Sequence, residues 1–126
     1  MADNINAMRD YQSAILLDPN YALAYYNSAN VLLLHHQFEQ ALQQYSNAID
    51  KCGMRDECTY QNRAIARALC DDSAGAFRDF TEALNYCKYS AHIYMNRGLL
   101  LFKLEKYDLA EKDFTSGNIA NCFLLT

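Results

Sequence analysis

Apolar residues recur along the chain at the spacing of amphipathic helices, and the same arrangement returns at a regular interval. Three stretches align with one another at spacings of 35 and 34 residues, beginning at Tyr25, Tyr60 and Tyr94. The residue four positions after each tyrosine is small: Ala29, Ala64 and Gly98. Self-similarity at such a period is typical of a repeat protein, in which each unit is one supersecondary element.

The shared pattern continues beyond these stretches. Three further columns are small or aromatic throughout: Ala41, Ala76 and Ala110; Tyr45, Phe80 and Phe114; Ala48, Ala83 and Gly117. A partial copy comes first, because Ala7, Tyr11 and Ala14 match the second half of the unit. The pattern predicts an unpaired helix near 4–17 and then three helix pairs, near 22–35 and 38–51, 57–70 and 73–86, and 91–104 and 107–119.

This unit resembles the tetratricopeptide repeat, a helix-turn-helix with an opening aromatic residue, small residues at the helix crossings and a closing proline. The closing proline survives only as Pro19. The resemblance covers nearly the whole chain and implies an all-α fold, a right-handed superhelix of antiparallel helix pairs. It divides the single domain into the second helix of an incomplete repeat at 4–21 and repeats at 22–56, 57–90 and 91–124.

Composition agrees with a packed helical domain and limits the classes of partner. One proline and 4 glycines leave few helix breakers in 126 residues. The formal charge of −4 provides no basic surface for nucleic acid or for an anionic membrane. No apolar run approaches the ~20 residues of a membrane span, and the N-terminus lacks the layout of a signal peptide. We therefore expect neither a nucleic-acid nor a membrane partner.

The cysteines indicate a reducing compartment. Their number, 5, is odd, and the sequence contains no C-x-x-C pair, so a disulfide framework is not expected. A reducing compartment, cytosolic or nuclear, fits these cysteines, and with an N-terminus unlike a signal peptide we predict a cytoplasmic protein.

Two arginines have a structural interpretation. Arg63 and Arg97 occur in one column, and only these two repeats carry an aspartate, Asp79 or Asp113, in the column sixteen residues later. We predict that each arginine forms an ion pair with the aspartate of its own repeat, because a half-buried guanidinium requires such a partner. A neutral pair replaces them in the first repeat.

A row of asparagines is the main candidate for function. The residue two positions after each opening tyrosine is Asn27, Asn62 or Asn96. The family resemblance implies that the first helices line a concave surface on which extended peptides bind. An asparagine amide can donate to a peptide C=O and accept from a peptide N–H, so the row could hold a peptide backbone. The alternative is that these are ordinary solvated surface residues.

Mostly apolar side chains surround the row. Those expected to contact a peptide are Tyr26, Asn30, Met95, Leu99 and Phe102. Exposed apolar surface with a polar rim marks interaction sites, although burial in the core is the alternative for such residues.

One known peptide class is not expected. Family members that bind chaperone C-termini hold a carboxylate with two lysines, an arginine and two asparagines. The corresponding residues here are Tyr26, Asn30, Asn62, His92 and Asn96. Only Asn30 and Asn62 fit that clamp, and without its cations strong binding of chaperone tails is not expected.

The sequence contains no recognisable arrangement of a nucleophile with a base, no phosphate-binding glycine loop and no carboxylate pair with a defined pocket. Cys58 and His92 share a column, but a metal site would require further ligands. We therefore predict a protein that is not an enzyme and has no cofactor or metal.

The hypothesis that the sequence favours is a non-catalytic scaffold that binds an extended peptide or partner segment in its concave groove. The alternative is a substrate-recruiting or architectural segment of a larger protein or enzyme. No polar cap is recognisable at the ends, and Phe123, Leu124 and Leu125 are apolar. Self-association through the ends is a further expectation.

Overall fold

The computed structural model describes the backbone of residues 2–125 and the side chains of residues 5–119. This part of the chain is helical, with no strand. The helices are α1 (Ala2–Leu17), α2 (Ala22–Leu34), α3 (Phe38–Ser46), the π-helical turn η1 (Asn47–Lys51), α4 (Glu57–Leu69), α5 (Ser73–Tyr86), α6 (Ala91–Lys103) and α7 (Tyr107–Leu125). None of the described helices is long and apolar enough to cross a membrane.

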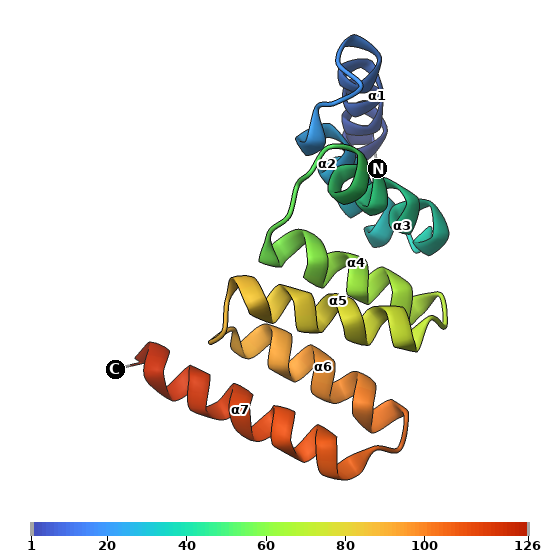
Figure 1. Ribbon diagram of the computed structural model, residues 1–126. Coiled ribbons are helices and arrows are strands. Elements are labelled where there is room, and N and C mark those ends of the chain that lie inside the picture. Colours follow the sequence, from blue (N-terminus) through green and yellow to red (C-terminus); the bar gives the residue numbers. More distant parts are fainter. Residues whose placement is uncertain (1, 126) are drawn as a thin grey trace.

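The helices form a stack of antiparallel pairs, α2 with α3, α4 with α5 and α6 with α7 (Figure 1). The first helices α2, α4 and α6 also contact one another along the stack. At one end α1 packs against α2. The predicted all-α solenoid is therefore confirmed, and the first helices begin at the predicted residues, Ala22, Glu57 and Ala91.

The predicted columns form the core. Six side chains of the second helices have exposed fractions of 0–2%: Ala41, Tyr45, Ala48, Ala76, Phe80 and Ala83. Gly98 of α6 faces α7 so closely that an added Cβ would lie 2.6 Å from the Phe114 ring. The small residue in this column lets the two helices of a repeat approach each other.

The turn between the helices of each pair has one geometry. His36, Asp71 and Glu105 adopt left-handed φ angles of 61°, 64° and 63°. The next backbone N–H in each turn donates to the carbonyl five residues earlier, at 2.8–2.9 Å. This is the Schellman ending of a helix, and it turns the chain back for the second helix.

One repeat carries an extra residue, and the structure shows where it is accommodated. Tyr60 follows Ala48 by twelve residues, whereas Tyr94 follows Ala83 by eleven. In the longer segment the last turn of α3 widens into η1, and Gly53 then adopts a φ of 72°. A π-helical turn takes up an inserted residue without breaking the helix.

Both predicted ion pairs are confirmed. Arg63 donates from Nε and Nη2 to the two carboxylate oxygens of Asp79, at 2.8 and 3.0 Å. Arg97 donates in the same way to Asp113, at 2.8 Å for both bonds. Burial opposes the charge of Arg63, but the hydrogen bonds and charge of Asp79 outweigh it and raise the pKa of Arg63. The pairs join α4 to α5 in the second repeat and α6 to α7 in the third.

Candidate functional site

The side of the stack that α2, α4 and α6 line is called the first-helix face. Each of these helices contributes one residue of the asparagine row, and Asn27, Asn62 and Asn96 are all half-buried. The three amides do not have the same surroundings.

The middle asparagine is bonded within the protein. The Asn62 side-chain amide donates to the Tyr26 hydroxyl at 3.3 Å and to the side-chain oxygen Oδ1 of Asn30 at 3.2 Å. The same Asn30 oxygen accepts a hydrogen bond from the buried hydroxyl of Tyr45. This network joins α2, α3 and α4. Both N–H groups of Asn62 are occupied, so its amide offers a ligand only its carbonyl oxygen.

The two outer asparagines differ from Asn62. Neither Asn27 nor Asn96 forms a side-chain hydrogen bond with any described residue. Each amide therefore retains both its donors and its acceptor for a ligand.

Tyr45 of α3 supports this network through contacts with both Tyr26 and Asn30. Its ring lies edge-on to Tyr26, with the centroids 6.1 Å apart. Burial, and to a lesser extent the neighbouring Tyr26, raise the pKa of Tyr45 well above its ordinary value. The hydroxyl consequently remains a hydrogen-bond donor to Asn30 at any physiological pH. Tyr26 and Asn30, both predicted to contact a peptide, are thus engaged in internal contacts as well.

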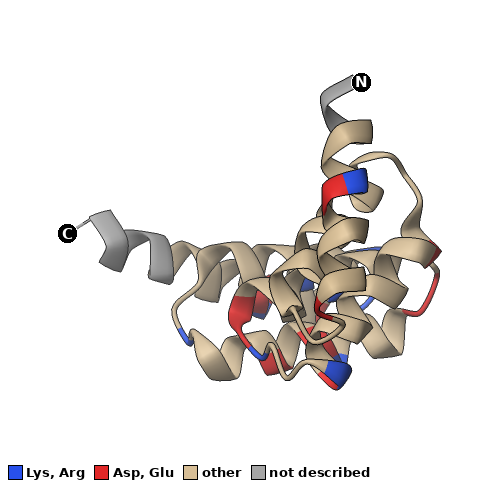
Figure 2. Cartoon of the chain, turned by 90° about the horizontal axis from the view of Figure 1, so that it is seen from above, with Lys and Arg blue, Asp and Glu red and all other residues tan. Residues whose placement is uncertain are grey.

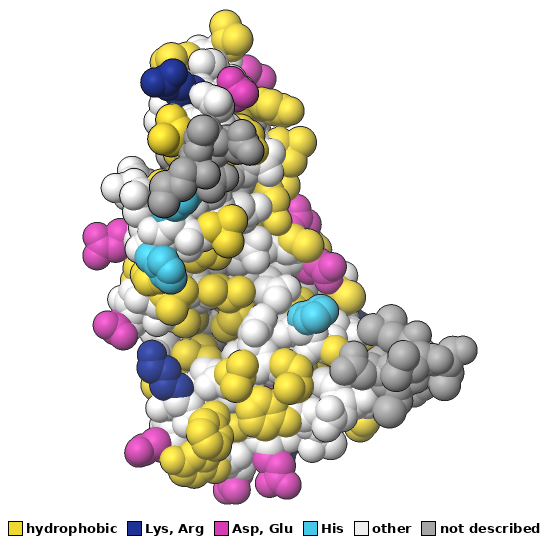
Figure 3. All heavy atoms as spheres, turned by 180° about the vertical axis from the view of Figure 1, so that it is seen from behind, with side chains coloured by type: hydrophobic (Ala, Val, Ile, Leu, Met, Phe, Trp, Pro, Cys, Tyr) yellow, Lys and Arg dark blue, Asp and Glu magenta, His cyan; other side chains and the backbone are white. Residues whose placement is uncertain are grey.

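The end of the face at α6 is apolar and exposed. Leu99 and Phe102 are 57% and 56% exposed, and Met95 is 37% exposed while also packing near Gly117 of α7. Seen from behind, apolar side chains gather over the lower helices, α6 and α7 (Figure 3). The structure adds Tyr107, whose ring lies edge-on to Phe102 at 5.2 Å. Its signal in the sequence is an aromatic residue in the same column as Phe38, at the start of a second helix.

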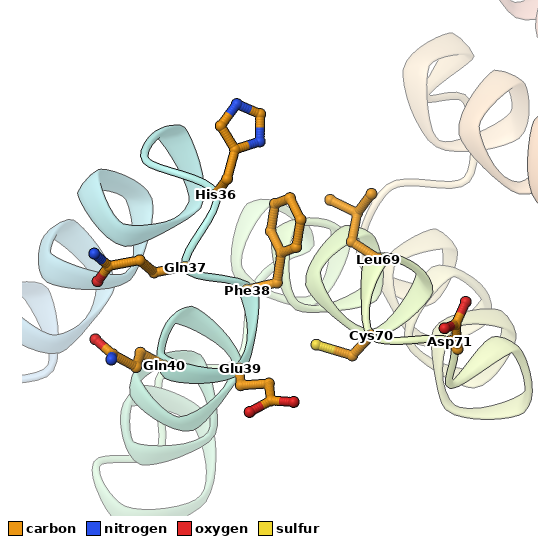
Figure 4. Close-up of a pocket in the computed structure, with 8 residues that line it drawn as sticks. All are labelled: His36, Gln37, Phe38, Glu39, Gln40, Leu69, Cys70 and Asp71. Carbon is orange, nitrogen blue, oxygen red and sulfur yellow. The ribbon is translucent and has the colours of Figure 1, made fainter.

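None of the described clefts is lined by an asparagine of the row. One of about 440 Å³ lies between the turns of two successive repeats and is lined by His36 to Gln40 and Leu69 to Asp71. Figure 4 shows the ring of Phe38 between His36 and Leu69. No asparagine of the row lines this cleft.

The described residues lack a metal-ligating cluster, and three of their thiols are weakly reactive. No three of their His, Cys, Asp and Glu side chains are grouped to hold a metal. Burial raises the pKa of the Cys58 and Cys70 thiols, and a hydrogen bond to Glu57 does so for Cys87, which makes these thiols poor nucleophiles. Acidic and basic segments lie beside one another along the ribbon (Figure 2).

The apolar residues Phe123, Leu124 and Leu125 lie outside the residues whose side chains the structure describes. Self-association through them stays a prediction.

Comparison with known proteins identifies the family. The family model of the tetratricopeptide repeat matches residues 10–43. The human tetratricopeptide repeat protein 6 is 44% identical over 69 residues, which is 55% of this chain and 13% of the human protein. The chain belongs to the tetratricopeptide repeat family. The zebrafish sperm-associated antigen 1A is 33% identical over 95 residues, 70% of this chain and 22% of that protein. This tetratricopeptide repeat chain thus spans less than a quarter of the length of either relative.

Solved structures share the tetratricopeptide repeat fold. A MamA RS-1 ArsTM double mutant superimposes with a TM-score of 0.89 at 17% identity, covering 98% of this chain and 68% of that chain. The second TPR domain of Spaghetti (RPAP3), bound to the HSP90 peptide SRMEEVD, superimposes with a TM-score of 0.72 at 20% identity. It covers 91% of this chain and 98% of that chain.

Proposed function

We propose that this chain is a non-catalytic interaction scaffold that binds an extended peptide or partner segment along its first-helix face. The observation that carries the proposal is the asparagine row, in which the half-buried amides of Asn27 and Asn96 have no partner among the described residues. Such amides can bond a peptide backbone whatever its side chains.

The spacing of the row suits an extended chain. First helices packed about 10 Å apart would meet a peptide about once every three residues, because an extended chain advances about 3.3 Å per residue. Asn62 would accept from a peptide N–H, since its own N–H groups bond Tyr26 and Asn30. The outer two asparagines would both donate and accept.

The α6 end would supply most of the binding energy. Leu99 and Phe102 are more than half exposed, and Met95 lies on the same helix. Burying apolar and aromatic side chains at the centre of an interface contributes more to affinity than rim contacts do. The partner would therefore carry apolar side chains in the segment that lies against α6.

An acidic chaperone tail does not suit this face. Tyr26 and His92 stand at two positions where a carboxylate clamp requires cations. The peptide in the Spaghetti structure, SRMEEVD, contains three acidic residues, and we do not expect this chain to bind it strongly.

The alternative is a substrate-recruiting or architectural segment of a larger protein or enzyme. The chain covers only 13% and 22% of the length of its two relatives, and this favours a place within a longer protein. A substrate-recruiting segment would bind its substrate on the same first-helix face, whereas an architectural segment would not require the face to bind a ligand.

The test starts from a defined ligand. Peptides of about 12 residues are selected from a random library on the wild-type chain, because this length passes all three asparagines of the row at about three residues per asparagine. The affinity of the best peptide is then measured by fluorescence anisotropy for the Asn27→Ala/Asn96→Ala double variant. We expect at least a tenfold loss with an unchanged melting temperature, because neither amide forms an internal hydrogen bond.

The matched control is Asn118→Ala, which removes an exposed asparagine from α7. We expect it to bind as the wild type does. Equal affinity of the double variant, or a library that yields no binding peptide, would contradict the proposal.

A further inference from the structure

The cleft of about 440 Å³ lies between the turns of the first and second repeats. One wall is the start of α3, with Phe38 and Glu39, and the other is the end of α4 and its turn, with Leu69, Cys70 and Asp71 (Figure 4). Both walls belong to neighbouring described repeats. Further repeats of a longer chain would stack on the ends of the array, because each repeat of a solenoid contacts only its neighbours. The cleft therefore faces a partner and not the next repeat.

The opening of the cleft is apolar. The ring of Phe38 is half-buried and stands between His36 and Leu69 (Figure 4). The imidazole of His36 packs edge-on to this ring, with the centroids 5.6 Å apart. Leu69 is 48% exposed. An aromatic ring beside an aliphatic side chain suits a long side chain with a methylene stem and a flat cationic head.

The cleft is negatively charged and contains no balancing cation. Glu39 and Asp71 are exposed, and neither forms an ion pair with a described residue. Arg67 of α4 pairs instead with Asp72 and Asp79, at 3.8 and 3.1 Å. No lysine or arginine lines the cleft. A ligand would therefore bring the positive charge itself.

The thiol of Cys70 shows that these charges act inside the cleft. Burial raises the pKa of this thiol, and the negative charges of Glu39, Asp71 and Asp72 raise it further. Carboxylates from both walls thus act on one atom. A cation beside this sulfur would be attracted by both walls at once.

The next step of the stack lacks this combination. Between the second and third repeats, Ser73 stands in the column of Phe38 and Lys103 in that of Leu69. The turn of the third repeat does carry carboxylates, but the cleft there is lined by Lys106 as well. Among the described clefts, an aromatic ring and carboxylates without a cation occur together only between the first two repeats.

From this we propose that the cleft binds an arginine side chain of a partner protein. The guanidinium stacks on the ring of Phe38 and donates to the carboxylates of Glu39 and Asp71, while the methylene stem packs against Leu69. Arginine suits the site better than lysine, because its flat and weakly hydrated head can stack on a ring and bond carboxylates at the same time. The site does not include the asparagine row, so it stands or falls independently of peptide binding there.

The probe is the tripeptide acetyl-Gly-Arg-Gly-amide, titrated into the ¹⁵N-labelled chain. We expect saturable NMR shifts of the backbone amides of residues 36–40 and 69–71, with a Kd of about 1–10 mM because a single side chain makes few contacts. The tripeptide with citrulline, which has the same shape without the charge, should bind at least fivefold more weakly. The tripeptide with lysine should also bind more weakly, and tighter binding of lysine would overturn the choice of arginine.

Two double variants locate the site. Glu39→Gln/Asp71→Asn should weaken binding of the arginine tripeptide at least fivefold, because it removes both unpaired carboxylates. The fold should be unchanged, since asparagine tolerates the positive φ of residue 71. The control is Glu105→Gln/Asp108→Asn, which removes the same charge at the turn of the third repeat and should leave binding unchanged. Equal weakening in both variants would show attraction by net charge alone and would overturn the proposal.

A second measurement does not depend on weak binding. A cationic trimethylammonium-ethyl and an anionic sulfonato-ethyl methanethiosulfonate react with Cys70, and mass spectrometry follows each rate at this residue. The ratio of the cationic to the anionic rate cancels changes in the reactivity of the thiol itself. We expect this ratio to fall at least fivefold in Glu39→Gln/Asp71→Asn and to stay at the wild-type value in the control. An unchanged ratio, or the absence of saturable shifts at residues 36–40 and 69–71, overturns the proposal.

Discussion

The two halves of the first-helix face are built differently. Between α2 and α4 the polar groups bond one another, with Asn62 donating to Tyr26 and Asn30. On α6 the equivalent surface holds Asn96 without an internal hydrogen bond, beside the exposed side chains of Leu99 and Phe102. In the first half this network fixes the geometry, and Asn27 is the one member of the row there without an internal hydrogen bond. In the second half the amide and its apolar neighbours are all open to a partner.

The difference shows how one repeat sequence can serve two purposes. A satisfied network stabilises and aligns neighbouring repeats, because bonded polar groups avoid the cost of burial without a partner. An open amide next to exposed apolar side chains adds little to stability but can add much to binding. Substitutions in the two halves should therefore affect different quantities.

The largest effect should come from the apolar side chains of α6. The double variant Leu99→Ala/Phe102→Ala should lose about 100-fold in affinity for the peptide selected on the wild type, because it removes two hydrophobic contacts of the interface. The melting temperature should change little, since both side chains are more than half exposed. Anisotropy titration and thermal unfolding measure the two quantities.

The control is Leu109→Ala, which removes an apolar side chain of α7 that is 48% exposed. Its affinity should equal that of the wild type. If both variants lost affinity equally, the α6 half would have no special part in binding.

The next effect is on stability. Asn62→Ala should lower the free energy of unfolding by about 1–3 kcal/mol, because it removes both hydrogen bonds that join α4 to α2. Asn96→Ala should change it by less than about 0.5 kcal/mol, since its amide has no internal hydrogen bond. Urea unfolding of the two variants and the wild type measures both changes in the free energy of unfolding. If both variants lost equal stability, Asn62 would contribute no more to the fold than Asn96 does, and the contrast between the two halves would be wrong.

A smaller effect concerns Tyr45 and pH. Because burial raises its pKa in the folded state, the neutral hydroxyl stabilises the fold fully below the ordinary tyrosine pKa, about 10, and this contribution is lost as the pH rises above it. Tyr45→Phe should cost about 1 kcal/mol at neutral pH by removing the hydrogen bond to Asn30. Between about pH 10 and pH 11.5 the stability of the wild type should fall more steeply than that of the variant. If the stability of both proteins fell equally with pH over this range, the raised pKa of Tyr45 would be contradicted.

Much of the fold was predictable from the sequence, because the helix packing repeats and each column can be compared three times. The recurring small and aromatic residues indicated the helix pairs, and the joint occurrence of Arg63 with Asp79 indicated their ion pair. Gly98 belongs to the column of small residues expected at the helix crossings, and its close approach to the Phe114 ring shows why a small residue is needed there.

The site was predictable only in part. The row of asparagines followed from their common column, but the bonding of Asn62 depends on how closely α2 and α4 approach, which a column does not show. Tyr107 was missed because it belongs to a second helix and reaches Phe102 across the turn.

The most direct test of a peptide-binding face is to observe the asparagine side chains themselves. The selected peptide is titrated into ¹⁵N-labelled protein, and the side-chain amide resonances of Asn27, Asn62, Asn96 and Asn118 are followed by NMR. We predict large shifts for Asn27 and Asn96, a smaller one for Asn62, whose N–H groups are already bonded, and none for Asn118. Shifts confined to Asn118 and other residues outside α2, α4 and α6 would contradict the account.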